Sequence, residues 1–399
     1  MGVQKMWNNI FQSKTWFIFP TWRCNLNCIM CFTKSPKKRL VELEISNWLD
    51  ILEFGCNFTK HFDIGGGEPF LKRGIENLLN FISESGCYST VTTNGTMIDT
   101  FLRTHKLNAS RIEVSIESFR DSVHNFIRPF VGEGTSFRQA MNGLKALVNL
   151  KQKGKLDAKI GVAQVMLKNN MRDFPLLVKK LGELGIDYLY SQPLDLIGLG
   201  KKLLSWLPSP IDYLDVILDT IHTLKTISNI SIKEISIYLP HPYYPFLATI
   251  FKKNTLIIND TILNVDMINC NCKQYDGMLA IGPDGSINGC YAQMNMLDLS
   301  AGYIIDYVAK PQEFQEAIKK ARERYIQLIK SEQFECKTCK YYWSCKGGCR
   351  ANALSYFGSL YKRDPRCPGE NYIIPEDLKE KAYFILDKID TQQIVWGGL

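Results

Sequence analysis

The sequence predicts an α/β fold, a partial (β/α)6 TIM-like barrel followed by a small α+β region. Three observations carry this prediction. Short β-branched and apolar runs alternate with stretches whose apolar residues recur at helical spacing, which is typical of right-handed β-α-β units and a parallel sheet. Six such runs are present, which fits a partial barrel better than a closed barrel of eight strands. Beyond these runs the composition changes, because most of the cysteines lie in the last third of the chain.

The first predicted strand, residues 17–20, ends shortly before a loop that contains three cysteines. The other predicted strands are residues 61–64, 90–93, 112–116, 159–166 and 188–192. Between the later strands, residues 137–150 and 174–184 carry apolar side chains at helical spacing. The loops at the carboxyl ends of such strands converge, so we expect the chemistry of the protein there.

The chain divides into four predicted regions. Residues 1–210 form the barrel, and residues 211–269 link it to the second domain at 270–370. Residues 371–399 form a bracing helix that begins at Pro375. The linking region contains a helix at 212–226 and an aromatic, proline-rich stretch at 239–246. That stretch either shapes a substrate pocket or is a surface loop before the next domain.

Composition excludes several classes of protein. With 48 Lys and Arg against 40 Asp and Glu, the net charge of +8 is spread over 399 residues and argues against a dedicated nucleic-acid binder. The longest early apolar run, residues 16–19, is too short for a signal-peptide core or a membrane span. Thirteen cysteines, an odd number in a long chain, do not form a disulfide framework. We expect a cytoplasmic protein with reduced thiols, metal-binding cysteine clusters, and no nucleic-acid or membrane partner.

Cys24, Cys28 and Cys31 lie on the loop that leaves the first predicted strand. Three thiolates in so short a loop can each bind one iron of an iron-sulfur cube and leave the fourth iron open. The open iron can take an amino and a carboxylate group from a small molecule. A zinc knuckle is the alternative, but it needs a fourth Cys or His close by, and the next histidine is His61.

This spacing, Cys-x3-Cys-x2-Cys, resembles the signature of the radical S-adenosylmethionine (SAM) superfamily. Met30 stands where an aromatic residue is usual, and Phe32 follows the last cysteine. The resemblance implies a 4Fe-4S cluster that binds SAM and, after one-electron reduction, cleaves it to methionine and a 5'-deoxyadenosyl radical. That radical abstracts hydrogen from an unactivated C–H bond of the substrate.

The same resemblance implies a set of SAM contacts. The segment 65–69, Gly-Gly-Gly-Glu-Pro, is similar to the glycine-rich segment that meets the SAM amino group, with glycines for close backbone approach and Glu68 as partner for the ammonium. Ser115 is similar to a residue near the ribose, and Arg128 to an arginine aimed at the carboxylate. The implied cofactor-binding residues are Gly66, Gly67, Glu68, Thr93, Asn94, Ser115 and Arg128.

The C-terminal cysteines resemble the seven-cysteine SPASM domain, with a hairpin at 278–288 that delivers Cys290. The resemblance implies two auxiliary 4Fe-4S clusters. The outer cluster would be held by Cys336, Cys339, Cys345 and Cys367, and the inner one by Cys272, Cys290 and Cys349, with Cys270 as a candidate fourth ligand. A zinc ribbon is the alternative for the outer set. Cys56 and Cys87 are expected to be core residues.

Members with such a domain mostly modify peptides or proteins, so the leading hypothesis is a peptide or protein maturase that uses a flavodoxin or ferredoxin as electron donor. Sulfatase maturases carry aspartate directly after the cysteine that ends the hairpin, whereas this chain has Tyr291, which is either a proton or electron relay or a packed aromatic. No other catalytic residue is assigned. The alternatives are radical modification of a small-molecule or tetrapyrrole cofactor precursor, and a zinc-binding interaction protein.

Overall fold

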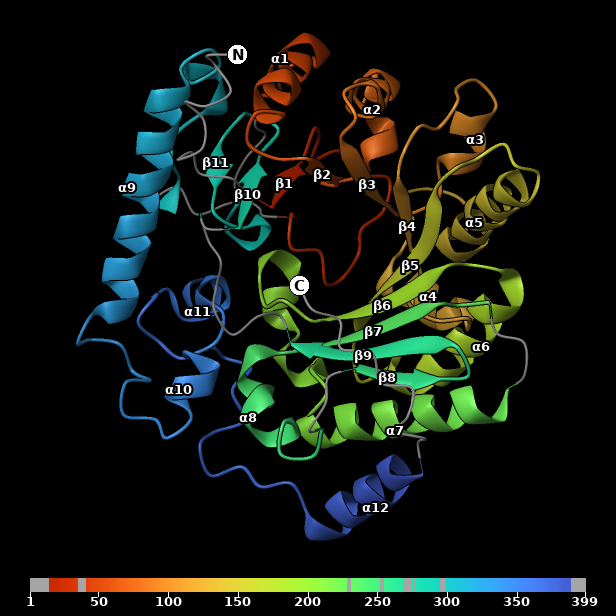
Figure 1. Ribbon diagram of the computed structural model, residues 1–399, viewed down its shortest axis with the longest axis vertical. Coiled ribbons are helices and arrows are strands. Elements are labelled where there is room, and N and C mark those ends of the chain that lie inside the picture. Colours follow the sequence, from red (N-terminus) through yellow and green to blue (C-terminus); the bar gives the residue numbers. More distant parts are fainter. Residues whose placement is uncertain are drawn as a thin grey trace, which may run out of the picture.

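A computed structural model describes residues 14–34, 41–227, 231–251, 255–267, 275, 277–294 and 299–388. Within these residues the strands form one curved sheet in the order β11-β10-β1-β2-β3-β4-β5-β6-β7-β9-β8 (Figure 1). Every neighbouring pair from β10 to β9 in that order is parallel, and only the two outermost pairs are antiparallel. The sheet does not close on itself, which confirms the predicted open α/β fold.

The strands are short and agree closely with the sequence prediction. β2 and β5 have the predicted bounds, and the other four predicted strands differ by one or two residues at one or both ends. The bounds are β1 (Thr15–Ile18), β2 (His61–Ile64), β3 (Tyr88–Thr93), β4 (Arg111–Ser115), β5 (Lys159–Met166), β6 (Tyr188–Pro193), β7 (Glu234–Leu239), β8 (Thr255–Ile258), β9 (Thr261–Met267), β10 (Met278–Ile281) and β11 (Ile287–Asn288).

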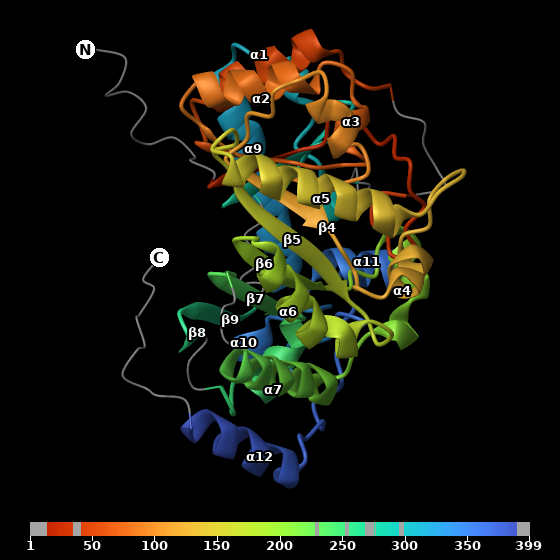
Figure 2. The same cartoon turned by 90° about the vertical axis from the view of Figure 1, so that its right-hand side faces the viewer.

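Helices cover the outer face of the sheet, and α5, α6 and α7 lie in front of the middle strands in Figure 2. The bounds are α1 (Ile45–Gly55), α2 (Ile75–Glu84), α3 (Ile98–Leu102), α4 (Asp121–Ile127), α5 (Ser136–Gln152), α6 (Phe174–Leu184), α7 (Pro210–Thr226), α8 (Tyr244–Leu247), α9 (Pro311–Lys330), α10 (Tyr342–Cys345), α11 (Arg350–Phe357) and α12 (Glu376–Asp387). Short 3-10 helices include η1 (Pro69–Leu71), η3 (Gly198–Lys202), η5 (His241–Tyr243) and η6 (Tyr291–Gln293).

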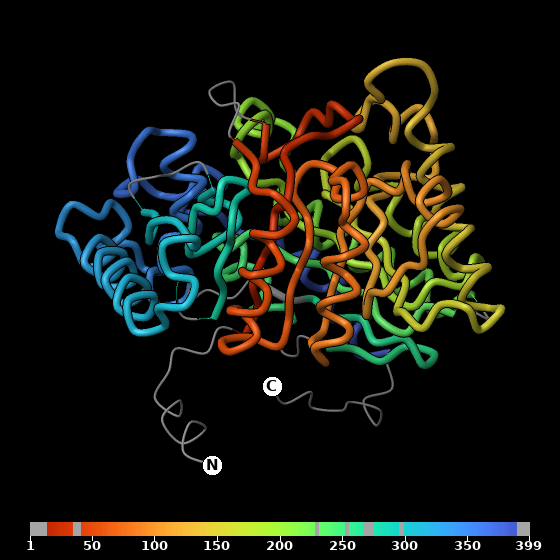
Figure 3. The backbone as a smooth tube through the Cα atoms, turned by 90° about the horizontal axis from the view of Figure 1, so that it is seen from above, coloured from red at the N-terminus to blue at the C-terminus, as the bar shows by residue number. Residues whose placement is uncertain are grey.

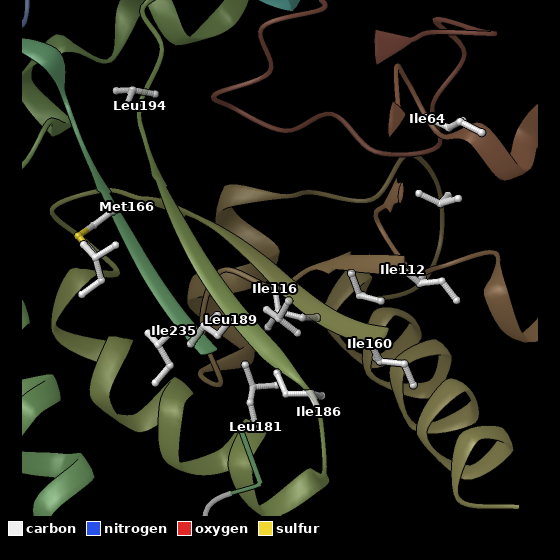
Figure 4. Close-up of a cluster of buried hydrophobic side chains, with 14 of the residues drawn as sticks. Ile64, Ile112, Ile116, Ile160, Met166, Leu181, Ile186, Leu189, Leu194 and Ile235 are labelled. Carbon is white, nitrogen blue, oxygen red and sulfur yellow. The ribbon is translucent and has the colours of Figure 1, made fainter. Parts of the chain in front are cut away.

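The main core lies between the sheet and these helices. Ile112, Ile160, Leu189 and Ile235 project from four successive strands and are fully buried, and Leu181 of α6 packs in the same cluster (Figure 4). Because side chains alternate along a strand, the residues between these apolar ones point to the inside of the curved sheet. Many of those inward residues are polar, and that inner face carries the site described below.

Strands beyond the six predicted for the barrel extend both edges of the sheet. The region 211–269, expected as a link, supplies β7, β8 and β9, and β7 pairs parallel with β6. At the opposite edge, β10 of the predicted hairpin pairs parallel with β1. The hairpin therefore belongs to the same sheet as the barrel strands, and the divisions expected at 210 and 270 do not follow that sheet. From above, the C-terminal elements lie beside the first strands (Figure 3).

The aromatic, proline-rich stretch at 239–246 is largely buried, so the expectation of a surface loop was wrong, while a part in a substrate pocket stays a prediction. His241, Pro242 and Tyr243 are buried in η5. Pro242, Pro245 and Phe246 line a space that four C-terminal cysteines share. Apolar side chains and prolines without a free N–H suit such an enclosed position.

Cys87 is buried and Cys56 is partly buried, and both pack with the core as expected. Their sulfur atoms lie 3.4 Å apart, although 31 residues separate them in the sequence. In the described part of the chain, no helix combines the length and the apolar character needed to cross a membrane.

Candidate active site

Three segments hold the loop with Cys24, Cys28 and Cys31 at the carboxyl end of β1. The segment after β2 runs alongside it, since Gly67 N–H donates to the Thr21 carbonyl at 2.9 Å and Glu68 N–H to the Arg23 carbonyl at 2.8 Å. The segment after α4 accepts from the loop, and the N–H of Ile29 donates to the Ile127 carbonyl at 3.0 Å. Leu199 of η3 donates to the Cys31 carbonyl at 2.9 Å. The loop is thus fixed by backbone contacts on several sides.

The glycines after β2 are required by this close packing. Gly66 has a φ of +118°, and a Cβ there would lie 2.5 Å from the Thr21 carbonyl oxygen. A Cβ on Gly67 would lie 2.2 Å from the Arg23 carbonyl oxygen. Both distances are impossible for a real side chain, so only glycine lets this segment pair with the cysteine loop. The sequence analysis gave close approach to a ligand as the reason, and the structure adds this second one.

A cavity of about 220 Å³ opens at the carboxyl ends of the parallel strands. The three cysteines line it together with residues that follow β2, β3 and β4, as the fold predicts. It brings together nearly all the predicted residues of the SAM site: Cys24, Cys28, Cys31, Gly66, Gly67, Thr93, Asn94, Ser115 and Arg128.

Glu68 is the exception, because its side chain lies under the site and does not line the cavity. It is fully buried, and its carboxylate accepts hydrogen bonds from Thr93 Oγ1 at 2.8 Å and from the N–H of Asn94 and Phe70 at 2.8 and 3.2 Å. Burial raises its pKa to about 7, although these donors oppose the shift. Protein donors contact both oxygens, and the expected role as partner of an ammonium stays a prediction. Glu68 ties the glycine segment to the end of β3.

Arg128 lies in the cavity wall, and its guanidinium contacts Glu117 Oε1 at 2.7 Å through both Nε and Nη2. Nη1 lies 3.7 Å from the Cys28 sulfur. Glu117 is fully buried and also accepts from the N–H of Val165 at 3.0 Å. The sequence analysis missed Glu117; its place two residues after Ser115, at the end of a strand, is a signal that could have found it.

The thiols fit a metal cluster on chemical grounds. Burial raises the pKa of Cys24, and it raises the pKa of Cys28 to about 12 despite the nearby Arg128. Such thiols remain protonated near neutral pH unless a metal binds them and stabilises the thiolate. Three clustered cysteines at a cavity with room beside them suit a cluster that also binds a small molecule.

The other side of the cavity is aromatic and neutral. Tyr291 lines it and packs against Phe17 and Phe32, with ring centroids 5.4 and 5.5 Å apart. Burial raises the Tyr291 pKa well above its ordinary value, and the carboxylate of Asp195 adds to the shift. Tyr291 is thus a packed aromatic that also faces the cavity, so the two interpretations of this residue are not exclusive.

Cys290 and Cys349, expected at an inner cluster, pack with Tyr291 and Phe32 in one small apolar group. The backbone N–H of Cys349 donates to Asp364 Oδ2 at 2.7 Å. Cys270 and Cys272 lie outside the described residues. Tyr291 therefore stands between the cavity and two of the cysteines expected at the inner cluster.

The four cysteines expected at the outer cluster, Cys336, Cys339, Cys345 and Cys367, line one separate small cavity. Burial raises the pKa of Cys336 to about 11 and that of Cys345 to about 12, so these thiols stay protonated near neutral pH unless a metal binds them. Across the described residues, no three His, Cys, Asp or Glu side chains converge closely enough to hold one metal ion.

Buried charges join this C-terminal region to the barrel, which the sequence analysis did not predict. Arg366 donates to Asp364 Oδ2 at 2.8 Å and to Asp195 Oδ1 at 3.2 Å, just beyond β6. Asn352 of α11 donates to the same Asp195 oxygen at 3.1 Å. Arg366 and Asp364 are almost completely buried, so they are structural.

Comparison with known proteins shows what the barrel is similar to. The family model described as the radical SAM superfamily matches residues 18–189. Among curated relatives, Fe-coproporphyrin III synthase of Methanosarcina barkeri is 23% identical over 378 residues, which cover 90% of this chain and 87% of that protein. Mycofactocin maturase MftC of Mycolicibacterium smegmatis is 30% identical over 175 residues, 42% of each chain.

Two solved structures share the fold over most of the chain. SuiB of Streptococcus suis bound to S-adenosylmethionine has a TM-score of 0.66 at 19% identity, covering 92% of this chain and 80% of SuiB. Native anSMEcpe with bound AdoMet has a TM-score of 0.60 at 20% identity, covering 94% of this chain and 98% of that one.

Proposed function

Because this chain is a radical SAM enzyme, we propose that it abstracts hydrogen from a peptide or protein substrate in a maturation reaction such as a crosslink or an oxidation. The bound 4Fe-4S cluster and SAM would supply the chemistry, namely reductive cleavage of SAM to a 5'-deoxyadenosyl radical. The chain itself binds, orients and shields the reactants from water.

The charge of the cavity is the observation that carries the choice of substrate. Of the described residues that line it, Asp63 and Arg128 are the ionisable ones besides cysteine and tyrosine, and Arg128 is paired with Glu117. A tetrapyrrole with several carboxylates would bring negative charge into the cavity. Those lining residues include no unpaired cation to balance that charge, so desolvating the carboxylates would cost a large free energy. Aromatic and neutral polar side chains such as Phe17, Tyr291 and Gln192 suit a peptide side chain.

Each residue of the SAM side receives a role in this proposal. Cys24, Cys28 and Cys31 hold the cluster. The backbone of Gly66 and Gly67, with Thr93, Asn94 and Ser115, lines the SAM pocket. Arg128, oriented by Glu117, presents its remaining N–H groups to the SAM carboxylate. Tyr291 closes the cavity on the side of Cys290 and Cys349.

We also propose two auxiliary 4Fe-4S clusters, with Cys336, Cys339, Cys345 and Cys367 at the outer one and Cys272, Cys290 and Cys349 at the inner one. The shared cavity of the first four cysteines and the common packing of Cys290 and Cys349 support this assignment. Such clusters would take up the electron released as product forms, and a flavodoxin or ferredoxin would supply the electron that starts the reaction. SuiB has also been solved with its precursor peptide SuiA.

The experiment uses protein reconstituted anaerobically with iron and sulfide, then supplied with SAM and dithionite. The candidate substrates are peptides encoded by small open reading frames beside the gene, synthesised with deuterated side chains. We expect deuterium in the 5'-deoxyadenosine and a matching mass change in the peptide. SAM cleavage without deuterium transfer from any such peptide would count against the maturase.

A second candidate, modification of a tetrapyrrole, rests on the relatives. Fe-coproporphyrin III synthase and an AdoMet-dependent heme synthase, both of M. barkeri, match 90% and 86% of this chain, whereas MftC matches 42%. The same assay with a panel of iron tetrapyrroles that carry carboxylate side chains in place of the peptide separates the two. Conversion of one of these tetrapyrroles at a rate that the peptides do not reach would replace the leading proposal.

A further inference from the structure

The floor of the central cavity is a cluster of polar side chains inside the barrel. Asp63 of β2, Thr92 of β3 and Tyr190 of β6 line the cavity. Glu113 of β4 lies among them, and Arg111 lies two residues earlier on the same strand. These residues occupy alternate strand positions whose neighbours, such as Ile112 and Ile64, form the outer core.

Neutral hydrogen-bond donors contact both carboxylate oxygens of Glu113. Its Oε2 accepts from Tyr190 at 2.7 Å and from Thr92 Oγ1 at 3.0 Å, and its Oε1 accepts from the Tyr188 hydroxyl at 3.1 Å. The Arg111 guanidinium stacks 3.9 Å above the Tyr188 ring, and Gly161 leaves the space that this ring occupies. Arg111 thus provides the positive charge that balances one carboxylate.

Asp63 is different, because no residue in the described ranges donates a hydrogen bond to its carboxyl. Asp63 is only partly buried, and it lines the cavity. Burial raises its pKa well above the ordinary value; the negative Glu113 adds to this shift and Arg111 opposes it. The floor therefore contains two carboxyl groups for one arginine, and the carboxyl without a partner is the one that faces the cavity.

We propose that Asp63 forms an acidic subsite that binds a positively charged group of the substrate, a primary ammonium or a guanidinium. A bound cation supplies both the missing hydrogen-bond donor and the missing positive charge, and binding converts the carboxyl to its ionised form. Asp63 lies two residues before Gly65, so a cation held there lies on the strand that leads directly into the SAM side of the cavity. This inference deepens the proposed function by naming a peptide residue with a cationic side chain.

The test measures binding to the full-length reconstituted protein by saturation-transfer NMR, with n-butylammonium as probe and n-pentanol as a neutral probe of similar size. We expect the wild type to bind the cation about tenfold more tightly than the alcohol. Asp63→Asn should abolish this preference, while Asp63→Glu should keep part of it. Asp99→Asn, which changes an exposed aspartate on α3, serves as matched control and should bind like the wild type.

Equal binding of the two probes to the wild type, or an unchanged preference in Asp63→Asn, would overturn the subsite. Circular dichroism of each variant shows whether it folds. If Asp63→Asn does not fold, Asp63→Glu still tests the subsite. The readout needs no turnover. Cation binding without modification of any peptide would therefore support the subsite and count against the maturase. Peptide modification without cation binding would support the maturase and count against the subsite.

Discussion

Glu117 holds Arg128 at the wall of the central cavity, with its Oε1 2.7 Å from two nitrogens of the guanidinium. Both side chains are largely buried, and the remaining terminal nitrogen points toward Cys28. A planar guanidinium fixed along one edge has a defined direction for its other donors. The pair therefore orients a cation beside the cysteine loop in addition to neutralising a buried carboxylate.

Replacing Arg128 with Gln should destabilise the protein by about 3–5 kcal/mol, because it leaves the Glu117 carboxylate buried and unpaired. The free energy of unfolding from urea denaturation measures this loss. Arg120→Gln is the control, since Arg120 pairs with Asp173 but its side chain is 54% exposed, and surface pairs contribute about 0–1 kcal/mol. Similar losses in the two variants would contradict the role given to the pair.

Gly67→Ala should damage the cysteine loop. The new Cβ meets the Arg23 carbonyl at 2.2 Å, so the segment after β2 has to move away from the loop. We expect reduced iron content after reconstitution and weaker SAM binding by calorimetry. Gly86→Ala is the comparison, because a new Cβ on Gly86 meets no atom within 4 Å, so the positive φ of Gly86 adds only about 1–2 kcal/mol of backbone strain. Full iron content in Gly67→Ala would show that the close packing is not needed.

Cys339→Ser tests the outer cluster. If the four cysteines that share the small cavity hold one 4Fe-4S cluster, this variant should lose about four irons per chain while SAM cleavage remains measurable. Product formation should stop. Cys87→Ser, a change at a buried core cysteine, should keep all the iron. An unchanged iron content in Cys339→Ser would remove the proposed outer cluster.

Asp63→Asn should change how stability depends on pH. The pKa of Asp63 is higher in the folded protein than in the unfolded chain. Its contribution to the free energy of unfolding is therefore fully present below the unfolded pKa and is lost as pH rises through the folded pKa. The variant should therefore melt at a higher temperature than the wild type at pH 8, by roughly 2–4 °C, and the difference should shrink toward pH 4.

Glu113, Arg111 and Tyr190 interact electrostatically with Asp63 in the barrel, and all three remain unchanged in this variant. Thermal unfolding followed by circular dichroism across that pH range gives the comparison. A melting difference that grows as pH falls would have the wrong sign and would refute the unpartnered carboxyl of Asp63.

Much of the barrel could be predicted because its signals are local. Apolar strands such as residues 159–166 and the helix at 174–184 carry their periodicity in consecutive residues, and the loop cysteines follow a fixed spacing. The rule that chemistry gathers at the carboxyl ends of parallel strands then placed Ser115 and Asn94 near Cys24.

What could not be predicted depends on long-range contacts. The parallel pairing of β10 with β1 joins residues more than 250 positions apart, and no local pattern distinguishes it from an independent hairpin. Glu68 and Glu117 look alike in a sequence, yet one is bonded to the backbone after β3 and the other to Arg128. Asp63 sits in an ordinary strand, and only the curvature of the sheet places it beside Glu113.

The most direct test of the central claim is SAM cleavage by the reconstituted protein under dithionite, with 5'-deoxyadenosine measured by liquid chromatography. The wild type should form 5'-deoxyadenosine, and Cys28→Ala should form none, because this variant loses a cysteine that lines the cavity and that we propose as a ligand of the cluster. Cys87→Ala should behave like the wild type. Formation of 5'-deoxyadenosine by Cys28→Ala at the wild-type rate would contradict the account.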